Sequence, residues 1–149
     1  MDEKLRLRIT KLIEKAERKL QAAQKLYESK MYEDAISRGY YTVYHAGMAL
    51  LASKGFSAKT HSGLQTMISL HFVKTGILPR EYYEILSRDK DLREDGDYEP
   101  FYTGSAEEAE SVLEDAKKFI TKIKKLLRPA SRNIHLNKKI PKKGRIRYN

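Results

Sequence analysis

The spacing of apolar residues predicts helices along most of the chain. Between positions 3 and 29, apolar side chains recur at steps of three and four residues, and neither Gly nor Pro interrupts them. Similar apolar stripes, separated by polar turns, predict four more helices. The expected helices cover residues 3–29, 32–53, 61–75, 79–94 and 105–127. No segment alternates with a period of two over a useful length, so we expect an all-α antiparallel bundle of about five helices with short connections.

Capping and helix-breaking residues mark the expected boundaries. A turn-rich loop over 95–100 separates the last two helices. Glycine commonly ends a helix, proline fits its first turn, and Ser-x-x-Glu forms a capping box at its start. The expected start signals are Thr60, Pro79 and the Ser105–Glu108 capping box, and the expected stop signals are Gly55, Gly76 and Pro129.

The second expected helix is unusual because residues 39–53 carry no charge unless His45 is protonated. One face centres on Tyr40 and Val43, and the opposite face is small and weakly polar. A helix without a solvated face is buried on both sides. Because so small a bundle covers one side, we expect a homodimer in which a second copy covers the other. The alternative is a central helix covered only by its own bundle.

Composition narrows the possible chemistry. The 149 residues are 40% hydrophobic and include no Cys, which excludes a disulfide scaffold, a thiolate metal site and a cysteine nucleophile. The four His residues lack zinc-site spacing, so we expect no metal and no cofactor. The amino terminus is charged from its second residue, and no stretch is long and apolar enough to span a membrane. We therefore expect a soluble, cytoplasmic protein with no membrane partner.

The net charge of +10 is concentrated at one end. Residues 128–149 contain eight Lys and Arg and no acidic residue, whereas residues 1–127 are nearly balanced. We expect a helical domain over 1–127 followed by a basic tail over 128–149. The tail cations, Arg145 and Arg147 among them, suit a nucleic-acid backbone. Its scattered Ile and Leu residues could equally anchor the tail on a partner protein.

Two groups of residues could bind a phosphate or act on it. Arg38, Tyr41 and His45 share one face of the second expected helix, with Arg38 as a clamp for an anion and His45 as a proton donor or acceptor. Arg93 and Tyr98 could face one groove near the end of the fourth expected helix. The structural alternatives are a buried Arg paired with a carboxylate, a buried His bonded to a carbonyl, and an Arg93 paired with its acidic neighbours.

Five segments, in order, resemble the motifs of small prokaryotic HEPN-domain proteins. Each motif alone is weak, but the ordered set is specific and spans about residues 4–127. The segments are 37–46 (SRGYYTVYHA), 59–63 (KTHSG), 72–76 (FVKTG), 92–98 (LREDGDY) and 105–109 (SAEEA). The resemblance implies a helical bundle that is usually a homodimer. For many members it also implies a toxin role beside a small nucleotidyltransferase antitoxin.

Many HEPN proteins are metal-independent RNases whose signature is an arginine and a histidine separated by four to six residues late in the fold. No histidine follows Arg93 at that distance, whereas Arg38 and His45 do have the literal spacing. The resemblance therefore implies a nucleotide- or RNA-binding component of a toxin–antitoxin pair, with Arg38, Tyr41, His45, Arg93 and Tyr98 as site candidates. The alternatives are an active RNase that uses Arg38 and His45 or Arg93, and a module that docks a nucleotidyltransferase without catalysis.

Overall fold

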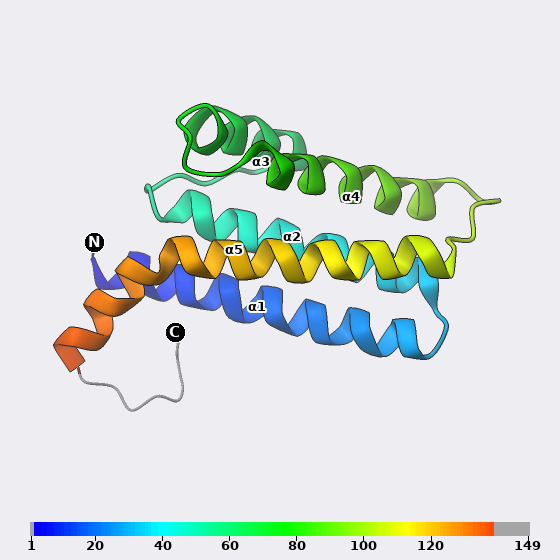
Figure 1. Cartoon of the computed structure of the whole chain (residues 1–149), viewed down its shortest axis with the longest axis horizontal. Helices are drawn as coiled ribbons and strands as arrows, with labels where there is room; N and C mark the ends of the chain where they lie inside the picture. The colour runs from blue at the N-terminus through cyan, green and yellow to red at the C-terminus, as the bar shows by residue number, and fades with distance from the viewer. Residues whose placement is uncertain (1, 139–149) are drawn as a thin grey trace.

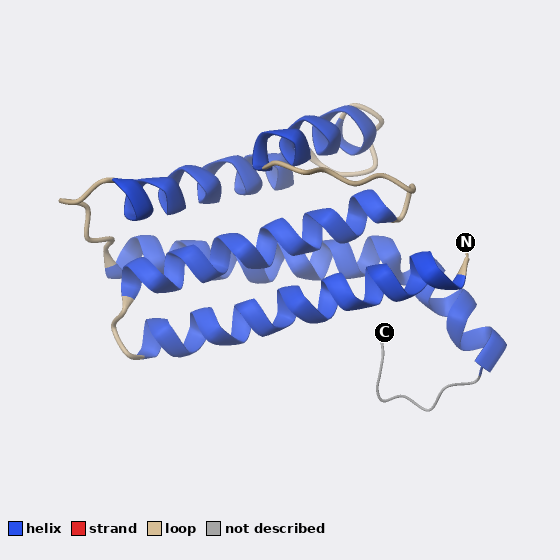
Figure 2. Cartoon of the chain, turned by 180° about the vertical axis from the view of Figure 1, so that it is seen from behind, coloured by secondary structure: helices blue, strands red, loops and turns tan. Residues whose placement is uncertain are grey.

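The computed structural model describes residues 2–138, and over these residues it contains helices and loops but no strand (Figure 2). The expected all-α bundle of five main helices is confirmed. A short π-helix, η1, directly continues α3. The elements are α1 (Glu3–Glu28), α2 (Tyr32–Ala52), α3 (His61–Ile68), η1 (Ser69–Val73), α4 (Arg80–Tyr98) and α5 (Ala106–Lys138).

The second helix, α2, is the centre of the bundle. Helices α1 and α5 pack along one side of it, and α3 and α4 pack along the other (Figure 1). Small residues allow the close approach to α1, since Ala16 and Ala23 of α1 and Ala46 and Ala49 of α2 are all fully buried. Both sides of α2 are therefore covered by helices of the same chain. This matches the alternative in which the central helix is covered by its own bundle and needs no second copy. The homodimer stays a prediction.

The expected capping interactions form. The Thr60 hydroxyl accepts a hydrogen bond of 2.9 Å from the backbone N–H of Gly63 at the start of α3. At the start of α5, the Ser105 hydroxyl accepts from the N–H of Glu108, and the Glu108 carboxylate accepts from the N–H of Ser105, both at 3.0 Å. Gly55 follows α2 with a φ of 80°, which suits a residue without a side chain.

Two predicted helix ends are wrong. The loop expected from residue 95 begins only after Tyr98, because the backbone N–H of Glu99 still bonds to the carbonyl of Asp95 at 3.0 Å. Gly96 lets this last stretch pack closely, since a Cβ there would lie 3.1 Å from the Cγ of Glu33 and 3.5 Å from the ring of Tyr102. Tertiary contact thus overrides the turn-forming composition.

The fifth helix does not end near residue 127 but continues through Pro129 to Lys138. Proline cannot donate the backbone hydrogen bond of a helix interior, so it bends a helix when it does not end it. Figure 1 shows the last turns of α5 bending away from α1. The expected boundary between domain and tail therefore falls inside a helix, and the separate role of 128–149 stays a prediction.

Candidate functional site

Six side chains from three helices gather where α2 meets α3 and α4. All are aromatic or cationic, and each has a ring or guanidinium contact with another member. We call them the arginine–tyrosine cluster. Its members are Tyr40, Tyr41, Tyr44 and His45 of α2, His61 of α3 and Arg93 of α4.

Arg93 lies at the centre of the cluster and is 7% exposed. Its guanidinium carbon is 5.0 Å from the centre of the Tyr40 ring and 5.4 Å from that of Tyr41, within the range of cation–π attraction. Its Nη1 also donates a hydrogen bond of 3.5 Å to the Tyr41 hydroxyl. Tyr40 is fully buried, whereas Tyr41 is half-buried. The two rings therefore orient the guanidinium from two sides.

His61 joins the cluster because it is the first residue of α3, directly after the Thr60 cap. Its Nδ1 and the Tyr40 hydroxyl share a hydrogen bond. Its ring centre lies 4.8 Å from that of Tyr44 and 5.1 Å from that of Tyr40. The Tyr40 side chain therefore contacts both an imidazole and the Arg93 guanidinium.

The surroundings keep the His61 imidazole neutral near pH 7. Burial lowers its pKa below the usual value, and the positive charges of Arg93 and Lys90 lower it further, against a smaller opposing effect of Glu94. Burial also raises the pKa of Tyr40, so its hydroxyl stays protonated. A neutral imidazole can accept a proton or a hydrogen bond, which is the ionisation state that a general base requires.

His45 lies on the α1 side of the cluster and is also neutral near pH 7. Burial lowers its pKa to about 4, and the nearby charges of Lys15 and Lys19 lower it further. Its ring is stacked with that of Tyr41 at 6.2 Å between centres and meets that of Tyr44 edge-on at 5.3 Å. His45 is therefore connected to Arg93 through Tyr41.

Asp89 lies one helical turn before Arg93 on α4 and is completely buried. Neither of its carboxyl oxygens has a hydrogen-bond partner, and the nearest cation, Nη2 of Arg88, is 3.6 Å from Oδ1. Arg88 instead bonds to Asp115 of α5. Burial therefore raises the pKa of Asp89 to about 7, although Arg88 opposes the shift. With this pKa, Asp89 changes its charge near physiological pH.

The structure brings together three of the sequence candidates, Tyr41, His45 and Arg93. Arg38 is exposed, and among the described residues no hydrogen bond or ion pair joins it to His45. Tyr98 is 77% exposed and is not a member of the cluster. The candidates Arg145 and Arg147 lie outside the described residues.

Sequence reasoning missed Tyr40, Tyr44 and His61 as site residues. Tyr40 was expected in the apolar core, where it does lie, but its hydroxyl reaches His61. The signal for His61 was its place after a helix cap, at a segment that could bind an anion. Nothing in the spacing of 61 and 93 indicates that their side chains approach one another.

The described helices and loops include no group of three or more His, Asp and Glu side chains placed to hold a metal ion. Within the same part of the chain, each helix is too short or too polar to cross a membrane.

Comparison with known proteins identifies the family. The profile of the HEPN domain matches residues 9–126, most of the chain. The chain belongs to the HEPN domain family. It is 38% identical over 128 residues to a protein of Methanocaldococcus jannaschii named "Putative toxin MJ0605", covering 86% of this chain and 95% of that protein. It is also 37% identical over 134 residues to "Putative toxin MJ0142" of the same organism, covering 90% of each.

The HEPN domain also accounts for the observed fold. The crystal structure of TT1696 from Thermus thermophilus matches with a TM-score of 0.70 at 20% identity, covering 80% of this chain and 98% of that one. At this identity the match concerns the arrangement of helices alone. The sequence resemblance to a small prokaryotic HEPN family is confirmed.

Proposed function

We propose that this HEPN protein is the RNA- or nucleotide-binding component of a toxin–antitoxin pair, and that the arginine–tyrosine cluster binds the ligand. The observation that carries the proposal is Arg93, whose guanidinium is oriented by the rings of Tyr40 and Tyr41. A guanidinium held in this way is prepared to bind a phosphate through two parallel hydrogen bonds. The half-buried rings of Tyr41, Tyr44 and His61 offer surfaces on which a base can stack.

Binding is tested by fluorescence anisotropy with a short labelled single-stranded RNA and with ATP as competitor. We expect Tyr41→Phe and His61→Gln each to weaken binding by about 3- to 10-fold, the usual effect of one lost hydrogen bond. His71→Gln is the matched control, because His71 is a half-buried histidine stacked on Phe56 outside the cluster. Equal affinity in all four proteins would refute the cluster as the binding site.

RNA cleavage without metal is the second candidate function. His61 is favoured as the base. No histidine follows Arg93 in the sequence at the spacing of the HEPN signature, but the fold brings the neutral imidazole of His61 to Tyr40, which also contacts Arg93. In such a reaction the Nδ1–H of His61 donates to the Tyr40 hydroxyl, and the 2′-hydroxyl gives its proton to Nε2 and attacks phosphorus. A 2′,3′-cyclic phosphate forms, and the 5′-oxygen leaves and takes a proton from water. Arg93 would stabilise the charge that develops on the phosphate.

Cleavage is tested by incubating RNA with the protein in the presence of a chelator and analysing the product ends. The proposal predicts 2′,3′-cyclic phosphate ends for the unmodified protein and their loss in His61→Gln, but not in His71→Gln. If the unmodified protein binds RNA and leaves it intact, the proposal of RNA binding is kept and the proposal of RNA cleavage is rejected.

The proposed partners are a second copy of the chain and a small nucleotidyltransferase antitoxin. Two large apolar side chains support a protein partner, since Tyr98, the last residue of α4, and Phe101, in the loop that follows, are 77% and 90% exposed. The similarity to two proteins named as toxins supports the toxin–antitoxin context. A purified protein that binds a nucleotidyltransferase but neither RNA nor nucleotide would instead favour a docking module.

A further inference from the structure

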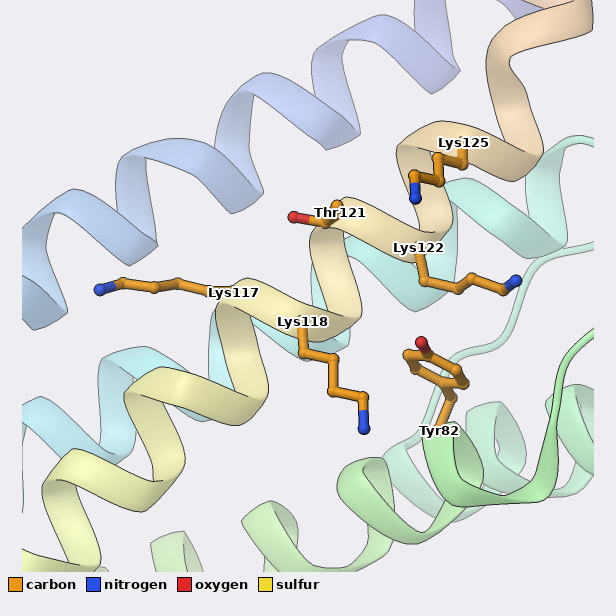
Figure 3. Close-up of a pocket in the computed structure, with 6 residues that line it drawn as sticks. All are labelled: Tyr82, Lys117, Lys118, Thr121, Lys122 and Lys125. Atoms are coloured by element: carbon orange, nitrogen blue, oxygen red, sulfur yellow. The ribbon is translucent and has the colours of Figure 1, made fainter.

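A groove between α4 and α5 concentrates positive charge away from the arginine–tyrosine cluster. It has a volume of about 330 Å³, and in Figure 3 Tyr82 of α4 points toward Lys118 and Lys122 of α5, whereas the side chain of Lys117 extends away from the ring. We call this surface the lysine groove. It is lined by Tyr82, Lys117, Lys118, Thr121, Lys122 and Lys125.

The charge of α5 changes sign abruptly along the helix. Residues 106–116 contain five acidic residues and no Lys or Arg, whereas 117–128 contain six basic residues and no Asp or Glu. Cations often stabilise the last turn of a helix through its dipole. Because α5 continues to Lys138, the lysines of the groove lie in its interior, where the dipole does not explain them.

Most of these lysines have no acidic partner. Lys118 forms an ion pair of 2.5 Å with Glu81 of α4. Within the part of the chain that the structure describes, Lys117, Lys122 and Lys125 form no ion pair. Lysines without an acidic partner that line one groove repel each other, and an anionic ligand relieves the repulsion.

Tyr82 adds a flat ring to the groove. The ammonium groups of Lys118 and Lys122 lie 5.5 and 5.9 Å from its ring centre. In Figure 3 the ring projects from α4 toward the lysines of α5. A ring bordered by cations suits a nucleic-acid base next to its phosphates, because bases stack on aromatic rings whatever their sequence. An acidic peptide would use the lysines but has no need of the ring.

The length of the lysine stripe fits a short piece of strand. Lys125 follows Lys117 by eight positions, which corresponds to about 12 Å along a helix. A stacked strand advances about 3.4 Å per nucleotide along its axis, so the stripe spans about three or four nucleotides. We infer that the lysine groove binds the backbone of single-stranded RNA, with Tyr82 as a stacking ring. This inference rests on RNA as the ligand of the proposed function but concerns a different surface.

The test measures binding of a short labelled single-stranded RNA to the full chain at several salt concentrations. The groove variant carries Lys117→Gln, Lys122→Gln and Lys125→Gln, and the control variant removes three exposed lysines of α1 through Lys4→Gln, Lys11→Gln and Lys25→Gln. Releasing three phosphate contacts should lower the magnitude of the log–log salt slope by about 2. We expect at least a 10-fold loss of affinity at low salt for the groove variant and a much smaller loss for the control.

A second pair of variants tests the ring. Tyr82→Phe keeps the stacking surface and should bind like the unmodified protein, whereas Tyr82→Leu should bind about 5-fold more weakly or worse. Polyglutamate serves as a second probe. If polyglutamate binds as tightly as RNA and Tyr82→Leu weakens neither, the groove recognises acidic protein and the inference is overturned.

The outcome also separates the groove from the cluster. Equal losses of RNA affinity in the groove and control variants would overturn the inference that the lysine groove binds RNA. An unmodified protein that does not bind RNA would overturn it as well. If the groove variant binds like the unmodified protein while His61→Gln is weakened, the groove fails and the proposed function stands. If the groove variant is weakened and His61→Gln and Tyr41→Phe are not, the groove stands and the cluster fails.

Discussion

Asp89 is the residue whose surroundings conflict most with its chemistry. A carboxyl group that is completely buried without a hydrogen-bond partner is costly to ionise. Its pKa is about 7 in the folded protein against 3.8 for the ordinary side chain. A pKa raised by folding adds stability that is fully present below pH 3.8 and is lost as the pH rises through 7.

Asp89→Asn should therefore remove a pH dependence of stability. Because Asn does not titrate, the free energy of unfolding of the variant should rise relative to that of the unmodified protein between pH 5 and pH 8. Over this pH range the change amounts to about 3 kcal/mol. Urea unfolding followed by circular dichroism at both pH values measures it, and Asp91→Asn at an exposed site is the control. If the free energies of unfolding of Asp89→Asn and the unmodified protein differ by the same amount at pH 5 and pH 8, the account is contradicted.

At the scale of elements, α2 packs closely against α5 at Gly39. A Cβ on this residue would lie 2.5 Å from Cγ1 of Val112, a distance at which the Val112 side chain or one of the two helices must shift. At Gly47 the nearest atoms, of Leu64, would lie 3.4 Å away in ordinary contact. The two glycines therefore differ in how much side chain the bundle tolerates.

Gly39→Ala should destabilise the bundle by about 1–3 kcal/mol through overpacking, despite the better helix propensity of alanine. Gly47→Ala is the matched control and should be close to neutral or stabilising, because its methyl group fits. Thermal unfolding of both variants distinguishes them. A Gly39→Ala protein that melts at or above the temperature of Gly47→Ala would show that α2 and α5 are not packed as described.

The helices could be predicted because their signals are local. The apolar stripes, the Thr60 and Ser105 caps and the stop at Gly55 each depend on neighbours within one or two turns. The end of α4 could not be predicted, since it depends on the packing of Gly96 against Glu33, far away in sequence. The continuation of α5 past Pro129 likewise has no local signal.

The candidate site was only partly predictable for the same reason. Tyr41 and His45 share a helix face, so their contact follows from the spacing of a helix. Arg93 and His61 both contact Tyr40 because three helices converge there, which the sequence pattern does not encode. Arg38 shares the face of His45 but lies in solvent.

At the scale of the whole molecule, Tyr98 and Phe101 are the features that fit a protein partner. Their exposure places two aromatic side chains in solvent at the end of α4 and in the loop that follows it. If a second copy covers them, light scattering should give twice the chain mass of 17.3 kDa. Replacing both by serine should then give a monomer with an unchanged helical spectrum. A parent protein that is monomeric at micromolar concentration would rule out the homodimer.

The central claim is that the arginine–tyrosine cluster binds a phosphate-containing ligand, and NMR of the side-chain nitrogens tests it most directly. Adding a short single-stranded RNA to the labelled full chain should shift the Arg93 Nε–H signal and the ring nitrogens of His61 and His45. The His71 ring, which stacks on Phe56 elsewhere, should stay unchanged. Saturating RNA that leaves Arg93, His61 and His45 unshifted, or shifts them no more than His71, would contradict the account.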